Sequence, residues 1–235
     1  MYVLIHSPLV GVSTWQGVAH ELKAEGFAVA VPALHDTDDS GLAYWQQHAA
    51  AIQEALKSVP SERRLILVGH SGAGSLLPAI RQQLPQPIAA YVFADAGLPR
   101  AGASRLDAIA TESPAWFQSF HEFLLAGGRF PAWRDEDLAD EIPDEQLRMA
   151  LESELQPRAL PFWTEPIPVF AGWPDAPCAY LQFSAAYDSP AAQARAQGWV
   201  YRHLPGGHFL PLVEPQAVAR ALISLPWDLG VDPST

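Results

Sequence analysis

Short apolar runs alternate with helical segments along most of this chain of 235 residues. The apolar runs are rich in Val, Ile, Leu and Tyr and show little two-residue periodicity, which is typical of strands buried on both faces. Strands that alternate with helices form a parallel sheet with helices on both sides. We therefore predict a doubly wound, mostly parallel α/β sheet of about six strands. The predicted strands are Tyr2–His6, Phe27–Pro32, Arg64–Gly69, Ala89–Ala94, Ala179–Ser184 and Trp199–Leu204. The predicted helices are Ser13–Glu25, Gly41–Ser58, Gly74–Leu84, Ala191–Gln197 and Pro215–Leu225.

One stretch, residues 99–168, interrupts this alternation. It contains helical segments and many aromatic residues, has no strand-like run, and is divided into short pieces by prolines. We expect a helical cap over one end of the sheet, inserted into a core of residues 1–98 and 169–235, with a single structural domain overall. An ordinary pair of packing helices is the alternative. Aromatic residues from this stretch, together with two residues near the sheet, are candidate pocket residues: His70, Trp116, Phe120, Trp163 and Phe209.

Composition excludes several partners. Apolar residues make up 49% of the chain, and the formal net charge is −12. Such an acidic surface would repel phosphate backbones and anionic lipid, so we expect neither nucleic acid nor a membrane as a partner. The single cysteine, Cys178, cannot form an internal disulfide. The chain starts with a strand-like segment rather than a secretory leader, and we expect a cytoplasmic protein.

The strongest local signal surrounds Ser71. A buried strand ends at Gly69 and a helix is predicted from Gly74, so Ser71 stands in the turn between them. The sequence is of the Gly-x-Ser-x-Gly type, with Ala73 at the second small position. Small residues are needed around a nucleophilic serine in such a tight turn, and the helix that follows directs backbone N–H groups at a developing oxyanion. A glycine-rich turn with an incidental serine is the alternative.

A general base for this serine is found near the end of the chain. His208 follows the last predicted strand and precedes the last helix, where its imidazole can reach the sheet edge that holds Ser71. A carboxylate should orient that imidazole. Asp188, after the penultimate strand, gives the order Ser, Asp, His and is favoured. Asp95, at the end of the strand after the serine, is the alternative.

These residues resemble the α/β-hydrolase superfamily over essentially the whole chain. Within it, the segment Leu4-Ile-His-Ser-Pro-Leu9 and the segment Val92-Phe-Ala-Asp-Ala-Gly-Leu-Pro99 resemble the small group of plant methylesterases and hydroxynitrile lyases. The resemblance implies a sheet that lacks the family's leading strands. It also implies an oxyanion loop at residues 7–9. Pro8 stands where the family has an N–H donor, and proline has no N–H to give. The expected donors are therefore Gly72 and Leu9.

Together these features predict a serine hydrolase that acts on a small to medium, mostly apolar ester, thioester or lactone through an acyl-enzyme. Two other functions stay open: a lyase-like or C–C bond-cleaving enzyme of the same fold, favoured by Pro8, and a ligand-binding module with little turnover. We expect no cofactor, because no His/Cys spacing matches a zinc site and no phosphate-binding glycine loop is present. The sequence does not distinguish a monomer from a homodimer.

Overall fold

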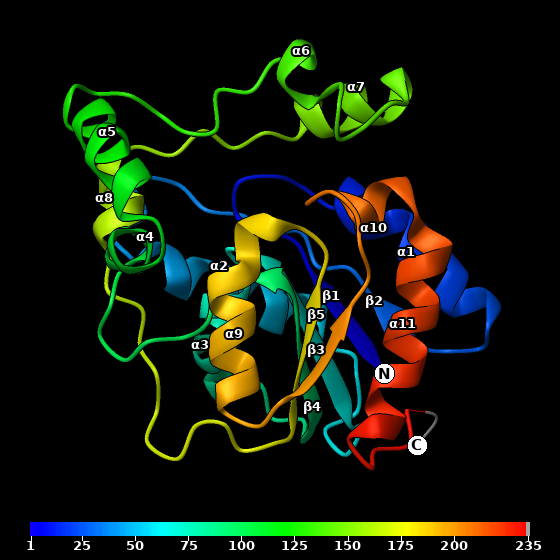
Figure 1. The fold of residues 1–235 in the computed structure, drawn as a ribbon. Coiled ribbons are helices and arrows are strands. Elements are labelled where there is room, and N and C mark those ends of the chain that lie inside the picture. Colours follow the sequence, from blue (N-terminus) through cyan, green and yellow to red (C-terminus); the bar gives the residue numbers. More distant parts are fainter. Residues whose placement is uncertain (234–235) are drawn as a thin grey trace.

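The computed structural model describes residues 1–233 and contains a six-stranded, fully parallel sheet (Figure 1). The strand order is β2-β1-β3-β4-β5-β6, so the direction of winding reverses between β1 and β3. This confirms the predicted doubly wound α/β fold. The strands are β1 (Tyr2–Ile5), β2 (Val29–Ala30), β3 (Leu65–Ser71), β4 (Ile88–Ala96), β5 (Cys178–Gln182) and β6 (Val200–His203). The edge strand β2 is shorter than predicted, because only its two central residues pair with β1.

Helices cover both faces of the sheet. On one face α1 (Ser13–Ala24) and α11 (Pro215–Asp228) pack against each other and against the sheet. On the other face lie α2 (Tyr44–Ala55), α3 (Leu77–Gln83) and α9 (Asp188–Ala196). Each face therefore has its own apolar core. All four residues of β1 are buried, which explains why the strands lack a polar alternate position.

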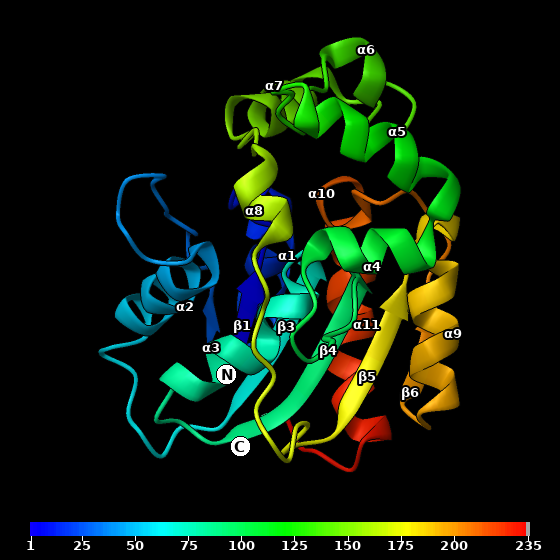
Figure 2. The same cartoon turned by 90° about the vertical axis from the view of Figure 1, so that its left-hand side faces the viewer.

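Residues between β4 and β5 form five helices above one end of the sheet. They are α4 (Arg105–Glu112), α5 (Pro114–Leu125), α6 (Asp135–Leu138), α7 (Glu145–Ser153) and α8 (Leu160–Thr164). Figure 2 shows them over the end of the sheet toward which β5 runs. The carboxyl ends of all six strands are at that end, because the sheet is parallel. Side chains that follow the strands therefore face these helices.

Short helical turns complete the chain near this end of the sheet. They are η1 (Gly74–Leu76) after β3, η2 (Ala185–Tyr187) after β5, and α10 (Leu210–Val213) after β6. The last of these was not expected from the sequence, because four residues give too short a periodic pattern. Over residues 1–233, no helix has the length and apolar character needed to span a bilayer.

Candidate active site

Ser71 occupies a strained turn between β3 and η1. It is the last residue of β3, and its φ of 56° lies in the left-handed region that side chains other than glycine rarely adopt. Close backbone contacts fix the turn. A Cβ on Gly69 would lie 3.2 Å from the carbonyl carbon of Ala73, and one on Gly74 would lie 2.3 Å from the carbonyl oxygen of Gly97. Space therefore requires glycine at position 74 and leaves little room for a side chain at position 69.

His208 pairs with Asp95. The imidazole Nδ1 lies 2.8 Å from Oδ2 of Asp95, whose side chain is fully buried at the end of β4. A carboxylate only accepts hydrogen bonds, so Nδ1 carries the proton and Nε2 keeps its lone pair. An imidazole in this tautomer can accept a proton at Nε2.

Three further hydrogen bonds hold the Asp95 carboxylate. Oδ1 accepts the backbone N–H groups of Phe183 and Ser184 at 2.9 and 3.0 Å, and Oδ2 accepts the Ser184 hydroxyl at 2.7 Å. Burial by itself raises the pKa of Asp95. The hydrogen bond and charge of His208 and the bonds from residues 183 and 184 outweigh burial, and the net pKa is lowered. Asp95 therefore stays ionised beside the imidazole.

Asp188 does not contact His208, and the preference for it as the orienting acid is wrong. Its Oδ1 accepts a hydrogen bond of 2.6 Å from Nε2 of Gln182, and it is the first residue of α9. The chain turns through η2 before it reaches Asp188, which carries this carboxylate away from the imidazole, whereas β4 ends directly beside it. The alternative acid, Asp95, is the one that the fold brings to His208.

Two rings stack on the His208 imidazole. The Tyr187 ring centroid is 5.0 Å away with planes 10° apart, and the His70 centroid is 4.5 Å away with planes 27° apart. His70 also lies 3.0 Å from the His208 carbonyl oxygen through Nε2, which must donate there. Burial lowers the pKa of His70 to about 3, so this ring is neutral. His70 thus supports the loop that carries His208.

The serine oxygen points at a tyrosine. Oγ of Ser71 lies 3.1 Å from the Tyr187 hydroxyl and forms a hydrogen bond with it. Within residues 1–233, Oγ forms no hydrogen bond with His208. Serine–histidine hydrogen bonds in enzyme sites are often long before substrate binds. Tyr187 was not singled out from the sequence, although it directly precedes Asp188 in the loop after β5.

A cavity of about 410 Å³ opens beside Ser71, between the carboxyl end of the sheet and the helices α4, α5, α6 and α8. Three of the predicted pocket residues, Trp116, Trp163 and Phe209, line it, and so do both predicted oxyanion donors, Gly72 and Leu9. Two of the predicted pocket residues do not line the cavity.

His70 and Phe120 are these two exceptions. His70 is fully buried behind His208. Phe120 packs its ring against Trp163 at 4.9 Å, inside the apolar cluster of the capping helices. Both side chains are therefore part of the packing that supports the cavity wall rather than of its surface.

The loop of residues 7–9 lies against Gly72. A Cβ on Gly72 would be 3.4 Å from Oγ of Ser7 and 3.6 Å from Cδ of Pro8. Pro8 donates no hydrogen bond, and the N–H of Leu9 is directed at Oγ of Ser7, 3.4 Å away. The backbone N–H of Leu9 is thus not aimed freely into the cavity.

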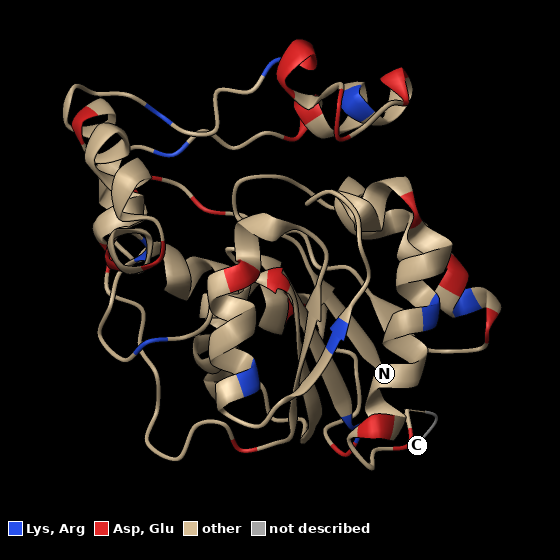
Figure 3. Cartoon of the chain, viewed as in Figure 1, with Lys and Arg blue, Asp and Glu red and all other residues tan. Residues whose placement is uncertain are grey.

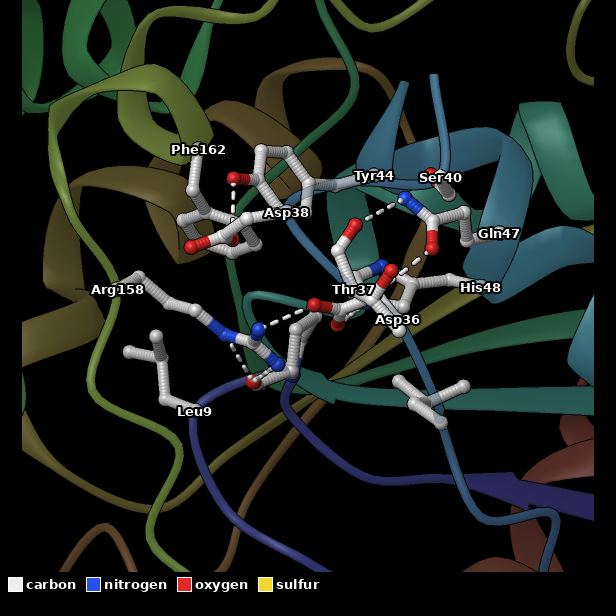
Figure 4. A network of polar contacts seen from close by, with 12 residues as sticks. Leu9, Asp36, Thr37, Asp38, Ser40, Tyr44, Gln47, His48, Arg158 and Phe162 are labelled. Carbon is white, nitrogen blue, oxygen red and sulfur yellow. Dashed lines mark hydrogen bonds and ion pairs between the residues drawn. The ribbon is translucent and has the colours of Figure 1, made fainter. Parts of the chain in front are cut away.

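Arg158, from the segment before α8, clamps this loop (Figure 4). Its Nε and Nη2 donate to the Pro8 carbonyl oxygen at 3.2 and 3.0 Å. Its Nη1 forms an ion pair with the buried Asp36, which also bonds Nε2 of His48 at 2.6 Å. Gln156 adds a backbone bond of 2.9 Å to the Leu9 carbonyl. The capping segment therefore determines how the loop lies at the cavity.

A protein-family model matches most of the chain. The model described as "Alpha/beta hydrolase family" matches residues 2–221. The chain belongs to the alpha/beta hydrolase family.

Solved α/β-hydrolases share the fold of this chain. An extracellular alpha/beta-hydrolase from a Paenibacillus species, described as sharing structural and functional homology to tobacco Salicylic Acid Binding Protein 2, has a TM-score of 0.74 at 22% identity, covering 95% of this chain and 98% of that one. A pyrethroid hydrolase from Sphingobium faniae JZ-2 has a TM-score of 0.70 at 18% identity, with 96% of each chain covered. At these identities the likeness concerns the fold.

Curated relatives match a shorter region of this α/β-hydrolase. Putative methylesterase 12 of Arabidopsis thaliana is 25% identical over 133 residues, which is 54% of this chain and 38% of the relative. Methylesterase 1 of the same plant is 30% identical over 104 residues, 42% of this chain and 40% of the relative. The matched region thus spans about two fifths of the length of these relatives.

Across residues 1–233, no group of three or more His, Cys, Asp and Glu residues is arranged to hold a metal ion. The acidic turn at residues 35–39, which could be imagined as a metal site, instead supplies Asp36 to the ion pair with Arg158.

Proposed function

We propose that this chain is a serine hydrolase that cleaves a small to medium, mostly apolar carboxylic ester, thioester or lactone through an acyl-enzyme. The observation that carries the proposal is the joint placement of Ser71, in a strained turn at the cavity wall, and the His208–Asp95 pair beside it. A strained turn costs folding free energy, and such strain is concentrated at functional sites. The curated methylesterases are consistent with an ester as substrate.

In the proposed reaction, Nε2 of His208 takes the Ser71 hydroxyl proton as Oγ forms a bond to the carbonyl carbon. The N–H of Gly72, the residue after the serine, donates to the oxyanion. Collapse of the tetrahedral intermediate breaks the bond to the leaving group, which receives the proton from His208. Water then attacks the acyl-enzyme by the same route and releases the acid. Asp95 stabilises the imidazolium at both stages.

The cavity lining supports a neutral, apolar substrate. Its two arginines are already paired: Arg100 bonds Glu112 at 3.0 Å, and Arg105 bonds Glu165 at 2.8 Å. The remaining charged lining residues, Asp137 and Glu141, are acidic and belong to the α6 region, where Figure 3 shows acidic residues above the sheet. A carboxylate on the substrate would have no unpaired cation to meet there and would be repelled by these side chains.

A fluorophosphonate probe tests the proposal directly. We expect the wild-type chain to form an adduct that peptide mass spectrometry locates at Ser71. Ser71→Ala should abolish labelling, and His208→Ala should suppress it. As a matched control, His203→Ala changes a histidine on β6, which is not placed at the cavity. The absence of an adduct on folded wild-type protein would overturn the proposal.

Pro8 favours a second function, lyase-like or C–C bond cleavage on the same fold. This chemistry needs no acyl-enzyme, so it depends less on two backbone donors to an oxyanion. Loss of one such donor costs roughly 10²–10³ in the rate of acyl transfer. Turnover of a substrate in H₂¹⁸O distinguishes the hydrolase from the lyase. Incorporation of ¹⁸O into a released acid supports the hydrolase, and products formed without water oxygen support the lyase.

A further inference from the structure

The Ser71–Tyr187 hydrogen bond has no part in the mechanism described above, although it is made to the oxygen that would attack the substrate. The two hydroxyl oxygens are 3.1 Å apart, although the residues are 116 positions apart in the chain. Tyr187 also lines the cavity. Its hydroxyl therefore touches the atom that would attack the substrate.

The fold holds Tyr187 in place from two sides. Asp95 binds the backbone N–H and the hydroxyl of Ser184, at the start of the turn that leads to Tyr187. Gln182 donates to the Ser184 carbonyl at 3.1 Å and to Asp188 at 2.6 Å, which closes the same turn after the tyrosine. The Tyr187 ring then stacks nearly parallel to His208. Asp95 thus fixes both the imidazole and the turn that presents the phenol.

The Tyr187 hydroxyl stays protonated at neutral pH. Burial raises the pKa of the phenol, the hydrogen bond with Ser71 opposes this, and the negative charges of Asp95 and Glu112 raise it further. The net pKa is well above the usual value for tyrosine. A neutral phenol can donate its hydrogen bond to Oγ, which leaves the Ser71 proton free to be directed to His208.

We propose that Tyr187 is a catalytic residue, whose hydroxyl donates a hydrogen bond to Oγ of Ser71 and stabilises the negative charge that develops there as His208 removes the proton. This inference rests on the proposed serine hydrolase function. Tyr187 keeps its proton throughout: the serine proton goes to Nε2 of His208, and Oγ forms its bond to the carbonyl carbon. A hydrogen bond to a charged oxygen is stronger than one to a neutral oxygen, so the contact favours the transition state over the ground state.

The Ser71–Tyr187 hydrogen bond matters more because the predicted oxyanion loop, residues 7–9, offers few N–H donors. Pro8 has no N–H, and the N–H of Leu9 points at Ser7, so this loop provides weak stabilisation of charge at the reacting centre. The Tyr187 hydroxyl instead stabilises the charge on Oγ of Ser71, which develops before the charge on the substrate oxygen. The Tyr187 hydroxyl therefore offsets, within the same site, the N–H donors that the loop of residues 7–9 does not supply.

Tyr187→Phe tests the inference, because it removes the hydroxyl and keeps the ring that stacks on His208. The measurement is the second-order rate of Ser71 labelling by a fluorophosphonate between pH 5 and 9, with the thermal unfolding midpoint as a check on folding. We expect the plateau rate to fall about 10- to 100-fold, with the midpoint of the acidic limb unchanged. Tyr44→Phe is the matched control, since its hydroxyl donates an exposed hydrogen bond to Asp38 in the loop before α2.

Other outcomes overturn the inference in distinguishable ways. If wild type labels at Ser71 and Tyr187→Phe labels equally fast, the hydrolase proposal stands and Tyr187 has no catalytic role. If the acidic limb shifts in Tyr187→Phe without loss of plateau rate, Tyr187 acts only by positioning His208. If wild type does not label at all, the proposed function fails, and the inference fails with it.

Discussion

Nδ1 of His208 lies 2.8 Å from Oδ2 of Asp95, although the two residues are 113 positions apart in the chain. Asp95 lies at the end of β4, next to the strand that ends in Ser71, and has a φ of 45°. Among the described residues, Ser71 and Asp95 are the two with a positive φ that are not glycine. Backbone strain is therefore found at two neighbouring strand ends of the candidate site, and one of them, Asp95, bonds His208.

The Asp95–His208 pair predicts unequal effects for two conservative substitutions. Asp95→Asn should lower the rate of Ser71 labelling by up to about 10⁴-fold, because an amide can donate to Nδ1 and favours the wrong tautomer. Asp188→Asn should lower it less than about tenfold, since an amide oxygen still accepts the bond from Gln182. Equal losses in the two variants would show that Asp95 does not orient the imidazole.

Buried histidines predict that stability falls in acid. Burial lowers the pKa of His6 to about 4 and that of His70 to about 3, whereas an unfolded chain has a histidine pKa of about 6.5. The unfolded state therefore binds more protons between these values. The free energy of unfolding should be highest above pH 6.5 and fall by up to about 1.4 kcal/mol per pH unit for each histidine as the pH drops. Urea unfolding at pH 7, 6 and 5 measures this slope.

Substitution of one buried histidine should flatten that slope. His70→Gln keeps an N–H donor for the His208 carbonyl and removes one titrating group. His20→Gln makes the same substitution at an exposed position of α1 and is the matched comparison. Parallel curves for all three proteins would contradict the assignment of proton uptake to His70.

The ion pair between Arg158 and Asp36, next to the loop of residues 7–9, predicts non-additive losses of stability. Arg158→Gln leaves the Asp36 carboxylate, 1% exposed, without its cation. We expect a loss of about 3–5 kcal/mol in the free energy of unfolding. Asp36→Asn combined with Arg158→Gln should cost less than the sum of the two single changes, because no charge is then left buried alone. Guanidinium unfolding of the four proteins gives the coupling, and additive losses would contradict it.

The turn after Ser71 predicts a loss of stability for one alanine substitution and almost no change for another. A Cβ on Gly74 would meet the Gly97 carbonyl oxygen at 2.3 Å, whereas a Cβ on Gly97 would meet nothing within 4 Å. Gly74→Ala should lower the free energy of unfolding by about 1–3 kcal/mol. Gly97→Ala should change it by no more than about 0.5 kcal/mol. Denaturant midpoints check both, and similar midpoints would show that the backbone relaxes around Gly74.

Sequence patterns determine the fold class of this protein and the tight turn at Ser71. The apolar runs predict all six strands, because a strand buried on both faces needs apolar side chains throughout. Ser71 was singled out for a local reason: strand, small residues and helix are adjacent in the chain, and the turn leaves no room for a side chain at Gly74 and little at Gly69. Constraints of this kind act between residues that are adjacent in the chain, so the sequence alone predicts them.

Tertiary structure decided which acid meets His208 and what contacts Ser71. Asp95 and Asp188 both follow strands, and the order of residues favoured Asp188. The actual partner depends on the path of the chain after β5, where η2 turns Asp188 toward Gln182 and brings Tyr187 to Ser71. The clamp of Arg158 on Pro8 joins residues 150 positions apart. Contacts of this kind depend on how strand ends and loops pack in space, and local sequence carries no periodic signal for that packing.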